Sequence, residues 1–217
     1  MRIKTGTAAL IYRFALLLVS ITGLILMTGY SSGKDGSELF CYYTVQSNLL
    51  ICLLYLSLCI RGGADLLRGR CVSCYYPRLK CGAVLCIFAT NLIFHFVLMP
   101  QMLYAGAAFE VYSMASIFVH YVVPLMTVVD WLVFDKRLTL RITDPLRWLC
   151  IPYGYFAGVL VRAAVGPVLS HGSRYPYFFI DVDKYGWLYV SRYLAILTVL
   201  FLCLGYLIFF TDRIIGS

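Results

Sequence analysis

Six long apolar stretches dominate this sequence and restrict the chain to one class of fold. Each comes close to the ~20 residues that a helix needs to cross about 30 Å of hydrocarbon. With 62% hydrophobic and 13% charged residues among 217, and a mean hydropathy of +0.85, the chain is too apolar for a soluble domain with a wet surface. We therefore expect an all-α, polytopic membrane protein, a bundle of six transmembrane helices. The predicted helices run over about 8–30, 39–60, 81–103, 111–134, 149–170 and 185–210.

The whole chain, residues 1–217, is predicted to form a single membrane domain. It has no segment that resembles a separate soluble domain, no internal repeat and no low-complexity tract. The first apolar stretch follows Arg2 and Lys4, as a secretory signal would. Because this stretch is long and no small-residue cleavage site follows it, we interpret it as a retained helix.

The net charge of +8 is explained by membrane topology rather than by nucleic-acid binding, since Lys and Arg are distributed unevenly between the predicted loops. With the N-terminus inside, the pieces 1–7, 61–80, 135–148 and 211–217 hold twelve Lys and Arg residues. The outer pieces 31–38, 104–110 and 171–184 hold three. This asymmetry predicts a protein of the cell membrane with both termini in the cytoplasm.

Four of the nine cysteines, Cys71, Cys74, Cys81 and Cys86, cluster on the predicted cytoplasmic side. The spacing of Cys71 and Cys74 fits a zinc knuckle or a redox pair, but no matching second pair follows. We expect plain reduced thiols, as is usual in the cytosol, with no metal and no cofactor.

Polar residues fall at nearly one depth in five of the six predicted helices. At 1.5 Å per residue, Thr44 lies ~7 Å from the outer end of its helix, Arg192 ~10 Å, and His95, His120 and Arg162 ~12–14 Å. Such residues are costly in lipid and usually face a bundle interior or a wet cavity. The polar residues at this depth form either a network that fixes helix packing or the lining of a ligand pocket. The two arginines have no carboxylate at their level, which favours an anionic ligand.

Arg13 and Asp130 lie nearer the predicted inner ends of their helices, where each can reach the headgroups. They can also pair with each other.

Within single helices the polar residues share faces, because residues three and four apart lie on one side. These sets are Thr44, Ser47 and Asn48; Asn91 and His95; Ser113, Ser116, His120 and Pro124; and Tyr155, Gly158, Arg162 and Gly166. Gln46 points away from its neighbours. Pro124 has no N–H, so it leaves the carbonyl of His120 without its helical partner and favours a kink there.

These residue types fit nucleophilic catalysis. A threonine hydroxyl needs a neighbouring base, and histidine is the usual one, so Thr44 would act with His120 or His95. The candidates for holding the substrate or donating to an oxyanion are Gln46, Ser47, Asn48, Asn91, His95, Arg162 and Arg192. The alternative is that Thr44 only bonds its own backbone, as threonines in helices usually do.

The outer loop 171–184 adds Tyr175, Pro176 and Tyr177, followed by Asp181 and Asp183. The aromatic residues suit a membrane interface and predict a lid over the polar level. The two acids could orient a histidine, contribute to a calcium site, or simply lie in water.

Three segments, in order, resemble the androgen-induced membrane protein family, most closely its bacterial six-helix branch. They are YYTVQSNLL at 42–50, FVHYVVPLMTVVDW at 118–131 and RYPYFFIDVDKYGW at 174–187. The animal members are multi-pass threonine hydrolases that cleave fatty acid esters of hydroxy fatty acids. The resemblance implies that Thr44 is the nucleophile and His120 the base, with the Tyr-Pro-aromatic motif at Tyr175 to Phe178. In the animal members the proline stands about one position later relative to the histidine.

Three functions are therefore compatible with the sequence. The first is an intramembrane hydrolase whose substrate is a membrane lipid or fatty acid ester. The second is a small-molecule or proton-coupled transporter with His95, His120 and Arg162 along its path, although the chain lacks the repeated halves of many transporters. The third is a non-catalytic membrane scaffold.

Overall fold

The computed structural model describes residues 2–29, 36–72 and 74–216, and within these ranges the chain is helical with no strand. Six helical spans are long and apolar enough to cross a membrane, as predicted, so this is a multi-pass membrane protein. The spans are Gly6–Thr28, Tyr43–Leu67, Pro77–Tyr104, Met114–Phe134, Asp144–Val165 and Val182–Gly216. Most of the predicted outer piece 31–38 lies outside the described residues.

Three of the spans are built from more than one element. The first two are α1 (Arg2–Thr28) and α2 (Tyr43–Leu67), with the 3-10 helix η2 (Ser37–Cys41) between them. The third joins α3 (Pro77–Ile93), the π-helical turn η3 (Phe94–Leu98) and α4 (Met99–Tyr104). After α5 (Ala108–Val111), the fourth joins α6 (Met114–Ile117), the π-helical turn η4 (Phe118–Val122) and α7 (Val123–Phe134). The fifth joins α8 (Asp144–Trp148) and α9 (Cys150–Val165); the 3-10 helix η5 (Phe178–Ile180) then precedes α10 (Val182–Gly216).

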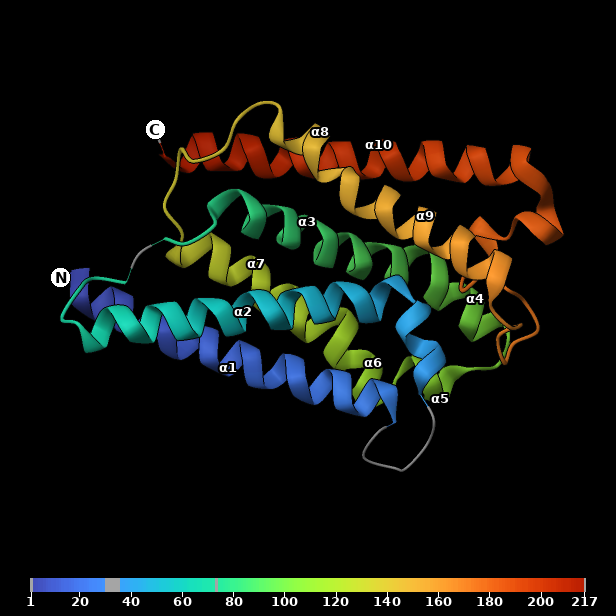
Figure 1. Cartoon of the computed structure of the whole chain (residues 1–217), viewed down its shortest axis with the longest axis horizontal. Coiled ribbons are helices and arrows are strands. Elements are labelled where there is room, and N and C mark those ends of the chain that lie inside the picture. The colour runs from blue at the N-terminus through green and yellow to red at the C-terminus, as the bar shows by residue number, and fades with distance from the viewer. Residues whose placement is uncertain (1, 30–35, 73, 217) are drawn as a thin grey trace.

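The spans lie roughly along one axis, and α1 begins at the same end of the bundle at which α10 ends (Figure 1). The third span is the most buried, because α3 packs on α2 and α7 on one side and on α10 and α8 on the other. The fifth span is the least buried of the six. Its helix α9 therefore lies at the edge of the bundle.

Several helix ends differ from the predicted boundaries, and two of these differences have a local cause and affect the site. The second helix begins at Tyr43 rather than near residue 39, because Tyr42 is extended and η2 takes up the residues before it. Helix α9 ends at Val165 rather than near 170, because Gly166 is extended and Pro167 cannot continue a helix. Thr44 is therefore in the first turn of its helix, and Arg162 lies close to a helix end rather than deep in a span.

Both π-helical turns lie just before a proline. The N–H of Met99 bonds the carbonyl of Phe94 ahead of Pro100, and the N–H of Val123 bonds that of Phe118 ahead of Pro124. A missing proline N–H removes one rung of the helical ladder, and the wider turn accommodates the loss. Such turns are often found at functional sites, and His95 and His120 each lie in one of these two.

A buried ionic cluster links α1, α3 and the end of α7 in the half of the bundle nearer the termini. Arg13 Nε lies 3.1 Å from Asp130 Oδ1, which confirms that these two residues pair. Arg13 Nη2 and Lys80 Nζ lie 3.0 and 2.5 Å from Asp135 Oδ1, and Lys80 also pairs with Asp130. Tyr55 donates its hydroxyl to Asp130 at 2.9 Å. Two positive and two negative charges thus neutralise one another out of water.

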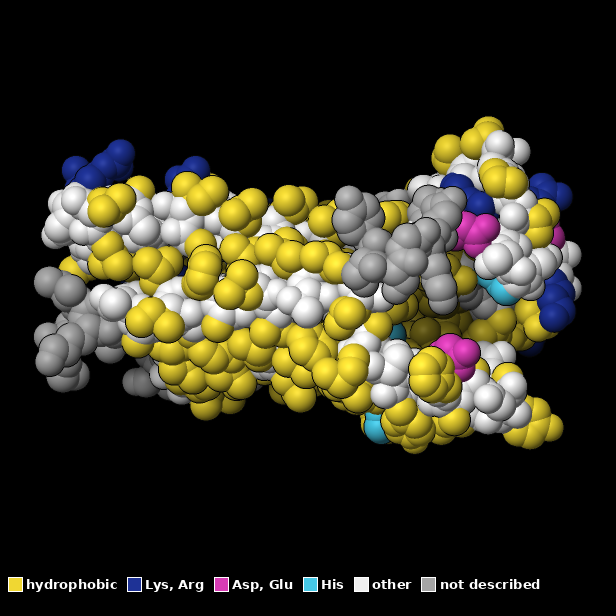
Figure 2. Space-filling view, turned by 90° about the horizontal axis from the view of Figure 1, so that it is seen from below, with side chains coloured by type: hydrophobic (Ala, Val, Ile, Leu, Met, Phe, Trp, Pro, Cys, Tyr) yellow, Lys and Arg dark blue, Asp and Glu magenta, His cyan; other side chains and the backbone are white. Residues whose placement is uncertain are grey.

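The outer surface fits a bilayer. Hydrophobic side chains cover most of the length of the face shown in Figure 2, and the coloured charged side chains gather at its two ends. The end opposite the termini is hollowed on this face. This is also the end at which α2 and α10 begin, close to the residues considered next.

Candidate active site

Thr44 and His120 meet inside the bundle although they are 76 residues apart. Thr44 Oγ1 lies 3.3 Å from His120 Nε2, and both residues are at least 95% buried. Separations slightly above the usual hydrogen-bond range are common for nucleophile and base pairs without substrate. The predicted pair is therefore brought together by the fold.

The other ring nitrogen of His120 determines which tautomer is present. Nδ1 lies 3.1 Å from the carbonyl oxygen of Ser116, one helical turn earlier, and 3.2 Å from Ser116 Oγ. A carbonyl oxygen can only accept, so Nδ1 carries the hydrogen and Nε2 presents its lone pair to Thr44. Thr44 then donates its hydroxyl to Nε2, which is the arrangement a general base requires.

The ring and backbone of His120 are held from α3 and the turn that follows it. Asn91 Nδ2 donates to the carbonyl oxygen of His120 at 2.6 Å. This is the carbonyl that Pro124 leaves without a helical partner, as the sequence predicts. The ring of Phe94 stacks on the imidazole with centroids 3.6 Å apart and an angle of 8°. The imidazole of His120 is therefore fixed in position.

Thr44 is held through its own backbone. Asn48 Nδ2 donates to the Thr44 carbonyl at 2.8 Å and to the Val119 carbonyl at 3.1 Å, so it ties α2 to the turn that carries His120. Ser47 Oγ donates to the Thr44 carbonyl at 3.1 Å and lies 3.0 Å from Thr90 Oγ1. The amide of Asn48 has no hydrogen left for an oxyanion, so Asn48 and Ser47 position the site.

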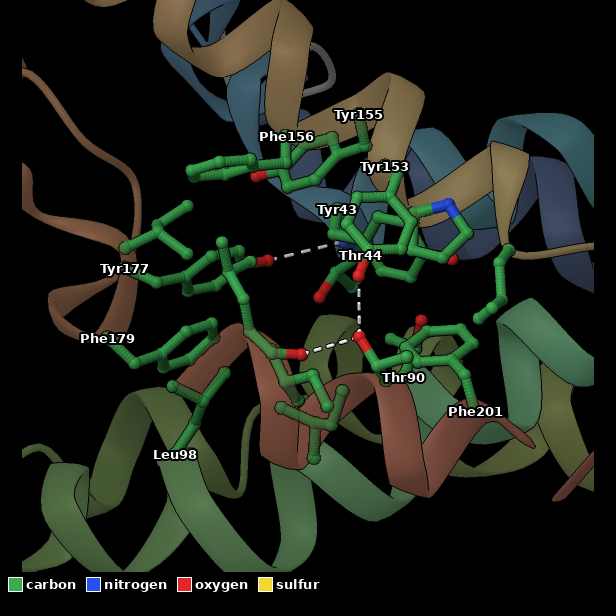
Figure 3. Close-up of a pocket in the computed structure, with 17 residues that line it drawn as sticks. Tyr43, Thr44, Thr90, Leu98, Tyr153, Tyr155, Phe156, Tyr177, Phe179 and Phe201 are labelled. Atoms are coloured by element: carbon green, nitrogen blue, oxygen red, sulfur yellow. Dashed lines mark hydrogen bonds between the residues drawn. The ribbon is translucent and has the colours of Figure 1, made fainter. Parts of the chain in front are cut away.

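The N–H of Thr44 is one of the orphan donors in the first turn of α2. It donates to the hydroxyl oxygen of Tyr177 at 3.4 Å, a bond drawn in Figure 3. Tyr177 is 9% exposed, and burial raises the pKa of its hydroxyl to about 12. The hydroxyl therefore keeps its proton at neutral pH and lies beside Thr44 at the cavity wall.

Thr44 and Tyr177 line a cavity with an empty volume of about 710 Å³, part of which opens to the outside (Figure 3). Its other walls come from α3, α9 and α10 and from the loop before α10. No charged residue lines it. The lining residues are Tyr43, Thr44, Thr90, Ile93, Leu98, Leu149, Pro152, Tyr153, Tyr155, Phe156, Tyr177, Phe179, Ile180, Leu194, Leu197, Thr198 and Phe201.

Of the candidate residues, Thr44 and Tyr177 line this cavity, and four of the others lie away from the Thr44–His120 pair. Gln46 is exposed and donates to the carbonyl of Phe40. His95 is exposed, with Nδ1 2.9 Å from the hydroxyl of Tyr121. Arg162 donates to the carbonyl of Arg174 at 2.8 Å, and Arg192 is exposed on α10. An anion-binding role for the two arginines stays a prediction, and it would apply outside the cavity.

The loop before α10 forms the outer wall of the site. Tyr175 and Pro176 are buried beside Tyr177, as expected of a lid. Asp181 accepts from Ser173 Oγ at 2.7 Å and from the N–H of Lys184 at 2.9 Å, and therefore caps the start of α10. Asp181 therefore holds the loop in place. Among the hydrogen bonds of the described residues, none joins Asp181 to a histidine.

The sequence reasoning missed the roles of Ser116, Phe94 and Thr90. Ser116 was placed on the face of His120, and its spacing of four residues was the signal that it contacts the ring. Phe94 and Thr90 flank Asn91 and gave no such signal. In the part of the chain that the structure describes, no group of three His, Cys, Asp or Glu side chains is placed to hold a metal ion. Ser73, between Cys71 and Cys74, lies outside that part.

The fold and this site define a six-helix multi-pass membrane protein in which a threonine–histidine pair adjoins an apolar cavity. No family model, curated protein or solved structure matches the chain.

Proposed function

We propose that this protein is an intramembrane hydrolase of lipid esters, with Thr44 as the nucleophile and His120 as the general base. The observation that carries the proposal is the bond between Thr44 Oγ1 and His120 Nε2 at the wall of an apolar cavity, with Nδ1 anchored on the Ser116 carbonyl. The resemblance of three sequence segments to a family of threonine hydrolases points the same way.

In the proposed reaction, His120 Nε2 takes the hydroxyl proton while Thr44 Oγ1 attacks the ester carbonyl carbon. The tetrahedral intermediate collapses, the alcohol leaves with the proton from His120, and the acyl group stays on Thr44. Water then attacks the acyl-threonine and gives its proton to His120. The second collapse releases the fatty acid and returns the proton to Thr44.

The negative charge that develops on the carbonyl oxygen needs a donor in the cavity. The Tyr177 hydroxyl is the best placed, because it lines the cavity, lies beside Thr44 and keeps its proton. Its oxygen accepts from the Thr44 N–H, which polarises the O–H and strengthens it as a donor.

The charge asymmetry of the loops supports a cell-membrane protein with both termini in the cytoplasm. In that orientation the site lies in the outer half of the bilayer. A carrier would also need a path through the inner half, where Arg13, Lys80, Asp130 and Asp135 neutralise one another. The hydrolase is therefore the function that the geometry favours.

The test is hydrolysis of long-chain lipid esters by the purified protein and its Thr44→Val and His120→Gln variants. We expect each variant to lose turnover by about a thousandfold or more, and the double variant to lose little further, because nucleophile and base act as a unit. A fluorophosphonate probe should label Thr44 in the wild type and leave Thr44→Val unlabelled.

Two substitutions of the same kind serve as controls. Thr127 is fully buried on α7 and bonds only the Val123 carbonyl, so Thr127→Val should remain active. His95→Gln should also remain active, since His95 faces outward. If Thr44→Val and His120→Gln fold and still hydrolyse esters at the wild-type rate, the proposed mechanism is wrong.

A further inference from the structure

The cavity beside Thr44 lies close to the outer surface of the bundle on the side of α9 and α10. Its lining residues on α2 and α3 include the buried Thr44 and Thr90, whereas those on α9 and α10 are partly exposed, apart from the buried Phe201. Tyr153 lines the cavity and is also 46% exposed at the outer surface. The side of α9 and α10 therefore faces the bilayer.

Among the hydrogen bonds of the described residues, one joins the side chains of α9 and α10 on this side of the cavity. The hydroxyls of Tyr153 on α9 and Thr198 on α10 lie 2.8 Å apart, and this is one of the bonds drawn in Figure 3. Thr198 also donates to the Leu194 carbonyl of its own helix at 2.7 Å, so Tyr153 donates to Thr198. One neutral hydrogen bond is a weak closure.

The cavity is elongated along α10. From Thr44 and Tyr177 it extends toward Leu149, just before α9, and Phe201 on α10. Its lining on α10 spans Leu194 to Phe201, or about 10 Å. Since no charged side chain lines it, a charged group would enter without a partner, at high cost. It suits an uncharged, unbranched chain.

The reaction chemistry determines which part of an ester lies there. The departing alcohol must take its proton from His120, which does not line the cavity. The alcohol therefore leaves on the histidine side of Thr44, and the acyl chain takes the cavity side.

We infer that the cavity is an acyl-chain channel that opens laterally between α9 and α10 and sets the acyl length of the substrate. The substrate class is an ester whose acyl chain is long and uncharged along its buried length. This inference rests on the proposed function for its orientation, but the binding of a fatty chain does not require catalysis.

The kinetic test uses p-nitrophenyl esters from butyryl to stearoyl, so that only the acyl chain varies. Burying each methylene should raise kcat/KM about three- to fourfold until the channel is full, after which the profile should level off. Thr198→Phe, which adds a ring inside the channel, should move this break to shorter chains. A terminal carboxylate on the acyl chain should abolish the gain from length.

Two variants are matched to Thr198→Phe. Thr198→Val removes the same hydroxyl at similar volume and should keep the wild-type break. Val199→Phe adds a ring at the neighbouring position, which is 60% exposed and does not line the channel, and should also keep it. A length profile without a break, or a break that stays in place in Thr198→Phe, overturns the inference.

A binding experiment separates this inference from the proposed function. In nanodiscs, a diazirine-bearing palmitic acid should crosslink to α9 and α10 in the catalytically dead Thr44→Val variant. Adding Thr198→Phe should reduce the crosslink severalfold, and adding Val199→Phe should not. Crosslinking here with no ester hydrolysis by the wild type would reject the hydrolase and retain the channel. Hydrolysis with crosslinks elsewhere would reject the channel and retain the hydrolase.

Discussion

At the scale of single residues, the site depends on hydrogen bonds that leave each group one orientation. His120 has its Nδ1 hydrogen committed to Ser116, and Asn48 has both amide hydrogens committed to backbone carbonyls. Tyr177 differs, because its hydroxyl oxygen accepts from the Thr44 N–H and its side chain lines the cavity. The Tyr177 hydroxyl is therefore the most informative single group to remove.

Tyr177→Phe should lower kcat by about a hundredfold or more and leave KM nearly unchanged, because an oxyanion donor acts in the transition state. The pKa of Tyr177, about 12, lies above its ordinary value, so its protonated form is favoured by folding. The contribution of this pKa shift to the free energy of unfolding is complete below a pH of about 10, and it is lost only as pH rises toward 12. The pH–rate profile at neutral pH should therefore keep its shape in the variant.

Tyr193→Phe is the matched control for this measurement. Its ring packs in the same aromatic cluster, and the residue does not line the cavity. A kcat in Tyr177→Phe equal to that of Tyr193→Phe would remove Tyr177 from the proposed mechanism and leave Thr44 and His120 untouched.

At the scale of elements, interrupted helices place the site and a buried ionic cluster joins the helices behind it. The π-helical turn η4 carries His120, and η2 delays the start of α2 so that Thr44 meets this turn. Toward the termini, Lys80 on α3 contacts both Asp130 and Asp135, and its side chain is 1% exposed. Removing one partner of a buried pair leaves an uncompensated charge.

Lys80→Met should therefore destabilise the protein by about 3–5 kcal/mol. Unfolding of the purified protein in a titration with sodium dodecyl sulfate measures this loss. Lys136→Met removes an exposed charge a short distance away and should change stability by no more than about 0.5 kcal/mol. Adding Asp135→Asn to Lys80→Met should restore part of the loss, and independent, additive effects would show that the two residues do not interact.

At the scale of the whole molecule, an apolar surface lies between two charged ends (Figure 2). The candidate site lies toward the end opposite the termini, because Thr44 is in the first turn of α2, which begins at that end (Figure 1). The proposed orientation makes that end extracellular. It follows from the excess of Lys and Arg in the loops on the side of the termini.

In a variant without native cysteines, Ser170→Cys should react with an impermeant thiol reagent in intact cells, and Arg68→Cys should react only after lysis. Both positions are exposed, so the difference reports the membrane side and not burial. The reverse pattern would place the site in the inner half of the bilayer.

Local properties of the sequence predicted the six spans, the shared face of Thr44, Ser47 and Asn48, and the free carbonyl before Pro124. They did so because hydropathy, helical periodicity and a missing N–H act within a few residues along the chain. The pairing of Arg13 with Asp130 was anticipated as the alternative to each side chain reaching the headgroups on its own.

Tertiary structure alone decided which of the polar residues meet. The contact between Thr44 and His120 joins segments 76 residues apart and depends on where α2 begins and how it packs against η4. The same packing left His95, Arg162 and Arg192 outside the cavity and lined it with apolar residues of α9 and α10 instead. Depth along a helix axis indicates the level of a side chain in the membrane. Its direction around the axis relative to a neighbouring helix is set by packing, which no single segment encodes.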